Sequence, residues 1–101
     1  MSYAEYEMKV VQWGEARGIV QNATAHSQAI KTLEEVTELF DALNKGDREA
    51  TKDAIGDIVV TLLMVCSVLD LDLTQCLAGA YDEIKNRKGY LTKEGIFVKQ
   101  A

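Results

Sequence analysis

The chain has 101 residues, of which 48% are hydrophobic and 27% charged, a balance typical of a single folded domain and unlike a disordered chain. Its net charge of −5 argues against a nucleic-acid partner, because binding a polyanion needs a basic patch. The N-terminus is charged where a signal peptide would be apolar, and the longest apolar stretch, residues 58–69, is too short to span a membrane. A soluble, cytoplasmic protein without a membrane partner is expected.

The spacing of apolar residues predicts an all-α fold made of a single domain over residues 1–101. Four helices are expected at about residues 3–17, 25–44, 48–69 and 73–88. Residues 21–24 read as a connector, and residues 89–101 as a short hairpin or an extended tail. Four helices joined by short connections make a compact bundle, or half of a larger one. A chain this small has a modest core, so oligomerisation is expected.

Two helices have distinct apolar patterns. The second predicted helix has a stripe at helical spacing that we expect to face the core: Ile30, Leu33, Val36, Phe40 and Leu43. The third is apolar nearly all round from residue 55 onward, which indicates a buried central helix. Asp57 interrupts that apolar run, and a buried carboxylate needs a partner, a proton or a metal ion.

Acidic residues on these two helices form a candidate metal site. Glu35 and Glu38 are three residues apart and share one helix face. If Asp57 faces the same space, the three oxygen ligands suit Mg²⁺ or Mn²⁺ better than zinc. Two other interpretations remain open: a solvated acidic face, and a salt bridge from Asp57 to Lys31 or Lys85.

The chain resembles the MazG-like nucleoside triphosphate pyrophosphohydrolases, in particular their short, phage-type members. The family signature is Glu-Glu-x-x-Glu followed, after a spacer, by Glu-x-x-Asp, and here residues 34–38 fit its first half and Gly56-Asp57 the end of its second. The similarity extends over nearly the whole chain through further segments: Trp13-Gly14, Gly18-Ile19, Gln28, Lys31, and residues 81–89 and 95–99.

The resemblance implies Mg²⁺-dependent hydrolysis of a (deoxy)nucleoside triphosphate to the monophosphate and pyrophosphate, with Mn²⁺ as a substitute. It also implies a homodimer or homotetramer whose helical bundle is completed across subunits. The residues expected to act are the carboxylates of a catalytic and metal-binding group (Glu34, Glu35, Glu38, Asp57 and Asp53) and a substrate-binding group (Lys31, Trp13, Lys85, Asn86 and Arg87). Trp13 lies on an apolar stripe, so a place in the core is the alternative to contact with a base.

One position departs from the family pattern. Where a glutamate is expected three residues before Asp57, the chain has Ala54, and Asp53 is the nearest substitute. The departure leaves two rivals to an enzyme: a nucleotide- or metal-binding relative without turnover, and a structural helical oligomerisation module.

Overall fold

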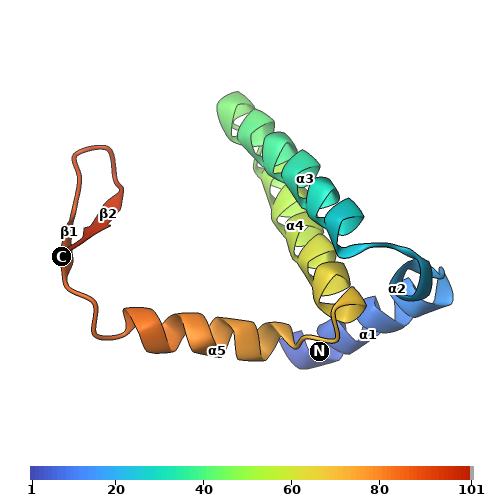
Figure 1. The fold of residues 1–101 in the computed structure, drawn as a ribbon. Coiled ribbons are helices and arrows are strands. Elements are labelled where there is room, and N and C mark those ends of the chain that lie inside the picture. The colour runs from blue at the N-terminus through green and yellow to red at the C-terminus, as the bar shows by residue number, and fades with distance from the viewer. Residues whose placement is uncertain (101) are drawn as a thin grey trace.

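The centre of the molecule is a hairpin of two long helices. The computed structural model describes residues 1–100, and in it α3 (Ala25–Lys45) and α4 (Arg48–Val68) run side by side in opposite directions (Figure 1). The turn between them follows from two residues. Gly46 ends α3 with φ of 66°, a left-handed conformation that glycine adopts without strain. Asp47 then caps α4, accepting a hydrogen bond from the backbone N–H of Ala50.

Small side chains allow these two helices to approach closely. Ala42 on α3 and Ala54 on α4 are only 4% and 3% exposed. One polar contact joins the helices, since the Thr32 hydroxyl donates a hydrogen bond of 2.8 Å to that of Thr61. Further along α4 the buried residues are larger: Leu63, Met64 and Cys66. The predicted core position of this part of α4 is therefore confirmed.

The N-terminal helices pack against α4 near these larger residues. α1 (Tyr3–Ala16) begins with a capping box formed by Ser2 and Glu5, and its Gly14 lies directly against Met64. A Cβ atom at Gly14 would stand 2.5 Å from the Met64 sulfur, so a larger residue here would displace the end of the Met64 side chain. A short helix, α2 (Ile19–Asn22), follows Gly18 at φ of 76° and takes up the first half of the predicted connector, residues 21–24.

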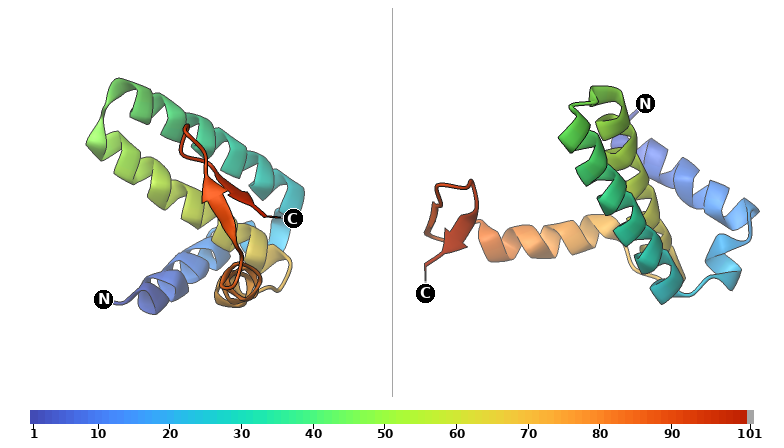
Figure 2. Two further views of the ribbon diagram at one scale, coloured as in Figure 1. Left: turned by 90° about the vertical axis from the view of Figure 1, so that its left-hand side faces the viewer. Right: turned by 90° about the horizontal axis from the view of Figure 1, so that it is seen from above.

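The C-terminal part forms an arm that projects away from the other helices (Figures 1 and 2). It consists of α5 (Leu73–Ile84), capped by Asp72, and an antiparallel hairpin of β1 (Gly89–Leu91) and β2 (Phe97–Lys99). Among the elements of residues 1–100, α5 contacts only α4, and the β-hairpin of β1 and β2 contacts none of the helices. The predicted β-hairpin is confirmed, but the helix expected to reach residue 88 ends at Ile84, where Lys85 is the C-cap and residues 85 and 86 form a turn.

Two predictions about burial are wrong for the single chain. In the α3 stripe Val36 is half-buried, and the other four residues are 56–68% exposed: Ile30, Leu33, Phe40 and Leu43. On α4, Ile55 and Leu62 share a face that is also exposed, and Asp57, on another side of the helix, is exposed as well. The reason is the arm: because α5 projects outward, it covers neither face. Within residues 1–100 no single helix is both long and apolar enough to cross a membrane; α4 and α5 meet both conditions only when taken together, and they are bent by 103° relative to each other.

Candidate metal centre

Three carboxylates converge in the groove between α3 and α4. One oxygen from each of Glu35, Glu38 and Asp57 lies within 4.8 Å of the others. The two glutamates come from successive turns of α3, and the aspartate comes from α4, which the turn at Gly46 brings alongside. This is the juxtaposition expected from the sequence. Three negative charges at such separations repel one another unless they share a proton or a cation.

Glu35 is the most constrained of the three. Its Oε2 atom is inaccessible to solvent and has no hydrogen-bond partner among residues 1–100. Burial raises the pKa of the Glu35 carboxyl, and a hydrogen bond to Glu38 and the negative charges of Glu38 and Asp57 raise it further, while the Lys31 ammonium lowers it. A buried carboxylate oxygen without a donor is costly, and a divalent cation is a partner that satisfies it without a donor. The residues therefore fit a hard metal ion that prefers oxygen ligands.

Asp57 belongs to the group for a different reason from the one the sequence suggested. It is exposed in the single chain, so its charge is not buried inside a helix core. Neither proposed salt-bridge partner pairs with it: Lys31 binds Glu34 at 2.8 Å, and Lys85 binds Asp82 at 3.2 Å. The salt-bridge interpretation is therefore wrong. What places Asp57 in the candidate metal site is its proximity to Glu35 and Glu38.

The neighbouring acidic positions lie outside the three-carboxylate group. Glu34 is exposed and accepts its hydrogen bond from Lys31, whose pKa rises mainly through that bond. Asp53 is exposed one turn before Asp57 and is not among the three converging residues. Ala54, at the position where the family pattern has glutamate, is buried against the rest of the chain. The structure thus offers three carboxylates where the pattern expects four.

A groove of about 350 Å³ opens beside these carboxylates. Its walls come from four helices and combine an indole, an ammonium and an amide with the acids; they include Trp13, Gln28, Lys31, Glu35, Asp57 and Thr61. Trp13 is 43% exposed, and the Arg17 guanidinium lies 5.7 Å from its ring centroid. The structure therefore brings Trp13 and Lys31 to the carboxylates. It places Trp13 at the rim of a groove, not in the core.

The basic residues predicted to bind substrate from the last helix lie elsewhere. Lys85, Asn86 and Arg87 follow the end of α5 on the projecting arm. Because the arm contacts the other elements only through α4, these side chains do not line the groove beside the carboxylates in the same chain.

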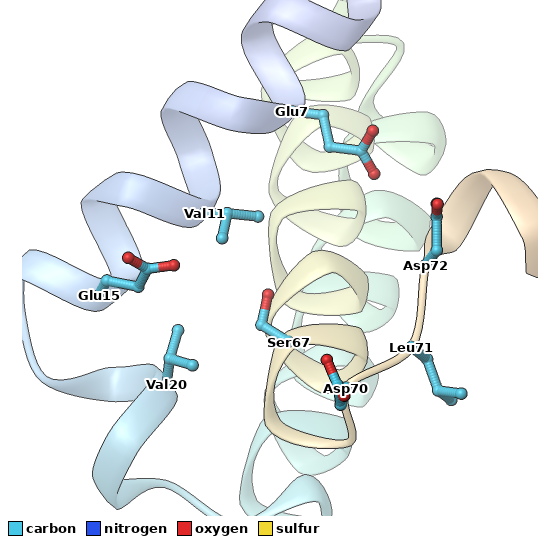
Figure 3. A pocket seen from close by; sticks show the side chains of 8 residues that line it. All are labelled: Glu7, Val11, Glu15, Val20, Ser67, Asp70, Leu71 and Asp72. Carbon is cyan, nitrogen blue, oxygen red and sulfur yellow. The ribbon is translucent and has the colours of Figure 1, made fainter.

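A second acidic pocket lies on another side of α1 (Figure 3). It has a volume of about 450 Å³, and its acidic wall residues are Glu7, Glu15, Asp70 and Asp72. Figure 3 shows these side chains spread around the pocket, with those of Glu7 and Asp72 pointing toward each other and that of Glu15 on the opposite wall. Among residues 1–100, the convergence of three potential metal ligands occurs at Glu35, Glu38 and Asp57 and not here.

Lys9 and Tyr6 were not predicted from sequence, yet they line a groove that also includes Asp57 and Trp13. A signal for them was present, because positions 6, 9 and 13 of a helix share one face. Their types alone, a surface lysine and a tyrosine, gave no reason to select them.

Three carboxylates that converge between two antiparallel helices of an all-α protein make a site that can hold a divalent cation, as in other helical bundles. A model of the MazG nucleotide pyrophosphohydrolase domain matches residues 23–92, which include α3, α4 and α5 and all three carboxylates. The chain belongs to the MazG nucleotide pyrophosphohydrolase family.

Two individual proteins are similar to this chain. An uncharacterized 18.2 kDa protein from the rep–hol intergenic region of Haemophilus phage HP1 is 33% identical over 63 residues, which are 62% of this chain but only 39% of that protein. A MazG-like pyrophosphohydrolase of cyanophage S-2L, solved with dGDP and three catalytic Mn²⁺ ions per active site, superimposes with a TM-score of 0.75. The superposition covers 100% of this chain and 95% of the cyanophage chain at 18% identity, and it establishes the shared fold.

Proposed function

We propose that this protein hydrolyses (deoxy)nucleoside triphosphates between the α and β phosphates, releasing the monophosphate and pyrophosphate, with Mg²⁺ as its metal and Mn²⁺ as a substitute. The observation that carries the proposal is the convergence of Glu35, Glu38 and Asp57 within 4.8 Å around a buried, partnerless Glu35 oxygen. Membership of the MazG family supports it, as does the nucleotide- and Mn²⁺-bound state of the cyanophage protein.

Glu35, Glu38 and Asp57 would hold the metal. A divalent cation in this place neutralises phosphate oxygens and makes a water molecule acidic enough to attack phosphorus at neutral pH. The carboxylates are already gathered in the free chain, so little reorganisation is needed before substrate binds. Asp53 keeps a proposed assisting role through water, since it is exposed one turn away on the same helix.

Lys31 and Trp13 line the groove beside the carboxylates and would position the nucleotide. Lys31 supplies a positive charge for the phosphates at one turn from Glu35. Glu34 accepts a hydrogen bond from Lys31 at 2.8 Å, so we assign it to orienting that ammonium and not to deprotonating water.

We also propose that the active assembly contains at least two chains. The exposed apolar residues of α3 and a second exposed apolar stripe on α5 (Leu77, Tyr81 and Ile84) both lack a partner within residues 1–100. Covering them would remove a large apolar surface from water. In such an assembly Lys85, Asn86 and Arg87 of the arm would meet the nucleotide bound to another chain.

The test is the product formed from dATP, dCTP, dGTP and dUTP with Mg²⁺ or Mn²⁺. The proposal predicts a monophosphate and pyrophosphate from at least one of them, and no release in excess EDTA. Formation of a diphosphate and inorganic phosphate would contradict the proposed bond cleavage. Nucleotide binding without any product would instead support a binding protein that lost turnover, which the alanine at the buried position 54 favours.

A second test addresses the structural alternative. If the carboxylates bind metal, millimolar Mg²⁺ raises the melting temperature by mass action, and Asp57→Asn abolishes that shift. If Mg²⁺ leaves the melting temperature of the wild-type protein unchanged, the three carboxylates bind no metal. They would then be part of the solvated surface of an oligomerisation module.

A further inference from the structure

α1 has two chemically different sides. Lys9, Trp13 and Arg17 follow one another at intervals of four residues and therefore share one side of the helix. Glu7 and Glu15 belong to another side and line the acidic pocket of Figure 3. In a chain with a net charge of −5, the side of α1 that carries Trp13 has two positive charges, and one of them, Lys9, lines a groove together with Asp57 of the candidate metal centre. This arrangement favours a negatively charged or electron-rich ligand lying along α1.

That side of α1 lines a groove of its own. Its volume is about 350 Å³, and it is lined by Tyr6, Lys9, Val10, Trp13, Asp57 and Val60. Three of these residues, Trp13, Asp57 and Val60, also line the groove that contains Glu35 and Lys31. The two grooves therefore meet at Asp57. The second groove is thus continuous with the one that holds Glu35 and Lys31, the proposed position of the phosphates.

The second groove is suited to a base in chemical terms. Two aromatic rings, of Tyr6 and Trp13, and two valines provide flat and apolar surfaces, which purines and pyrimidines contact favourably. The Lys9 ammonium is the one cation among its lining residues within the described part of the chain. An ammonium group has three donors and no acceptor, so it pairs with a carbonyl oxygen at the purine 6-position or the pyrimidine 4-position and is mismatched with an amino group there.

We propose that this groove is the nucleobase subsite and that Lys9 selects bases carrying an oxygen, and not an amino group, at the purine 6-position or the pyrimidine 4-position. Guanine, uracil and thymine are preferred over adenine and cytosine. The proposal rests on the proposed function for the placement of the phosphates. Lys9 is a specificity-determining residue here, and Trp13 forms the surface against which the base lies.

Binding can be followed without turnover, because Trp13 is the only tryptophan in the chain. The experiment titrates wild-type protein with dGMP, dAMP, dUMP and dCMP in the presence of Mg²⁺ and records quenching of tryptophan fluorescence. We expect dGMP to bind about tenfold more tightly than dAMP, and dUMP about tenfold more tightly than dCMP, which is the effect of one hydrogen bond to a charged group.

Three variants separate the role of Lys9 from a general charge effect. Lys9→Met removes the donors and should equalise the affinities within each pair, dGMP with dAMP and dUMP with dCMP, whereas Lys9→Glu introduces an acceptor and should reverse the order within each pair. The matched control is Lys52→Met, which removes an exposed lysine of α4 that is 3.9 Å from Glu49 and lines neither groove; it should keep the wild-type order. The lysines at both positions are exposed, so folding is not at risk.

The outcomes separate this inference from the proposed function. The same base order in wild type and Lys9→Met, equal affinities in wild type, or no quenching by any monophosphate would each overturn the subsite assignment. Pyrophosphate release could still be observed in those cases, and the proposed function would stand. Conversely, a Lys9-dependent base order in a protein that releases no pyrophosphate would keep the subsite and overturn the proposed reaction.

Discussion

The α3–α4 hairpin packs against itself within one chain, whereas the C-terminal arm is almost entirely exposed. The hairpin buries small residues between its helices and brings three carboxylates together without help from another subunit. On the arm, every residue of α5 except the half-buried Leu73 is exposed, and so are both strands. The two regions also differ in charge, since residues 85–101 hold five of the eleven basic residues and one of the sixteen acidic ones.

The candidate metal centre and the proposed assembly surface are therefore separable. The centre depends on contacts inside the α3–α4 hairpin, whereas the arm contacts the rest of residues 1–100 only through α4. A substitution in the hairpin should therefore affect metal binding and folding in an isolated chain. A substitution in the arm should affect association first and activity only as a consequence.

The largest expected effect is on the carboxylates of the hairpin. Asp57→Asn removes one negative charge from the converging group and should lower metal-dependent pyrophosphate release at least about a hundredfold. The matched control is Asp53→Asn, one turn away on the same exposed side, which should cost less than about tenfold. Steady-state kinetics with Mg²⁺ measure both variants. Equal losses of activity in the two variants would show that Asp53 belongs to the metal-binding group as much as Asp57 does.

The next effect concerns the arm. Leu77 is 69% exposed on the apolar stripe of α5, and Leu77→Glu places a charge on the surface proposed to pack against a second chain. The molar mass in solution, measured by light scattering, should fall to that of one chain while the helix content from circular dichroism is retained. Gln75→Glu adds the same charge on the opposite side of α5 and should leave the mass unchanged. A variant Leu77→Glu that keeps the wild-type mass would remove α5 from the interface.

A smaller effect tests the packing of the hairpin itself. Thr61→Val deletes the hydrogen bond of 2.8 Å to Thr32 while keeping the side-chain shape, and it should reduce the free energy of unfolding by about 1 kcal/mol. Thr37→Val is the control, because that exposed hydroxyl donates only to Leu33 within its own helix. Urea denaturation measures both. A loss at Thr37 as large as that at Thr61 would mean that the contact between helices adds nothing of its own.

The smallest effect is a pH dependence of the metal-free protein. The pKa of Glu35 is raised in the folded state, mainly by burial, so the folded chain holds a proton that the unfolded chain has released. Stability in EDTA should therefore fall as pH rises from the ordinary glutamate range near about 4.3 through the raised value. Thermal melts of wild type and Glu35→Gln across this pH range measure the fall in stability. The part of the fall that is due to Glu35 should be absent from the variant. A wild-type curve parallel to that of Glu35→Gln would show that Glu35 titrates normally.

The sequence predicted the secondary structure well because its signals are local. Thr24, Gly46, Asp47 and Asp72 act as helix caps or stops, and the apolar spacing between them fixes helices α3 and α4. The last turn before residue 88 was predicted wrongly, since nothing local distinguishes a basic helix end from a basic loop.

It was harder to predict which helix faces are buried within the chain and which are exposed. Periodicity shows that Phe40 and Leu43 share a stripe, but it does not say whether the stripe is covered by the same chain or by another. The same ambiguity affected Asp57, which was expected in a buried run and lies on an exposed face. Glu35 and Glu38 were found because their spacing is itself the signal. The buried, partnerless oxygen of Glu35 depends on contacts across two helices and has no signature in the sequence.

The most direct test of the metal centre is the position of Mn²⁺ in crystals of the protein, located by its anomalous scattering. We predict a peak between α3 and α4 that is coordinated by carboxylate oxygens of Glu35, Glu38 and Asp57, and its loss in Asp57→Asn. A peak only in the acidic pocket that contains Glu7 and Asp72, or no peak between the two helices, would contradict the assignment.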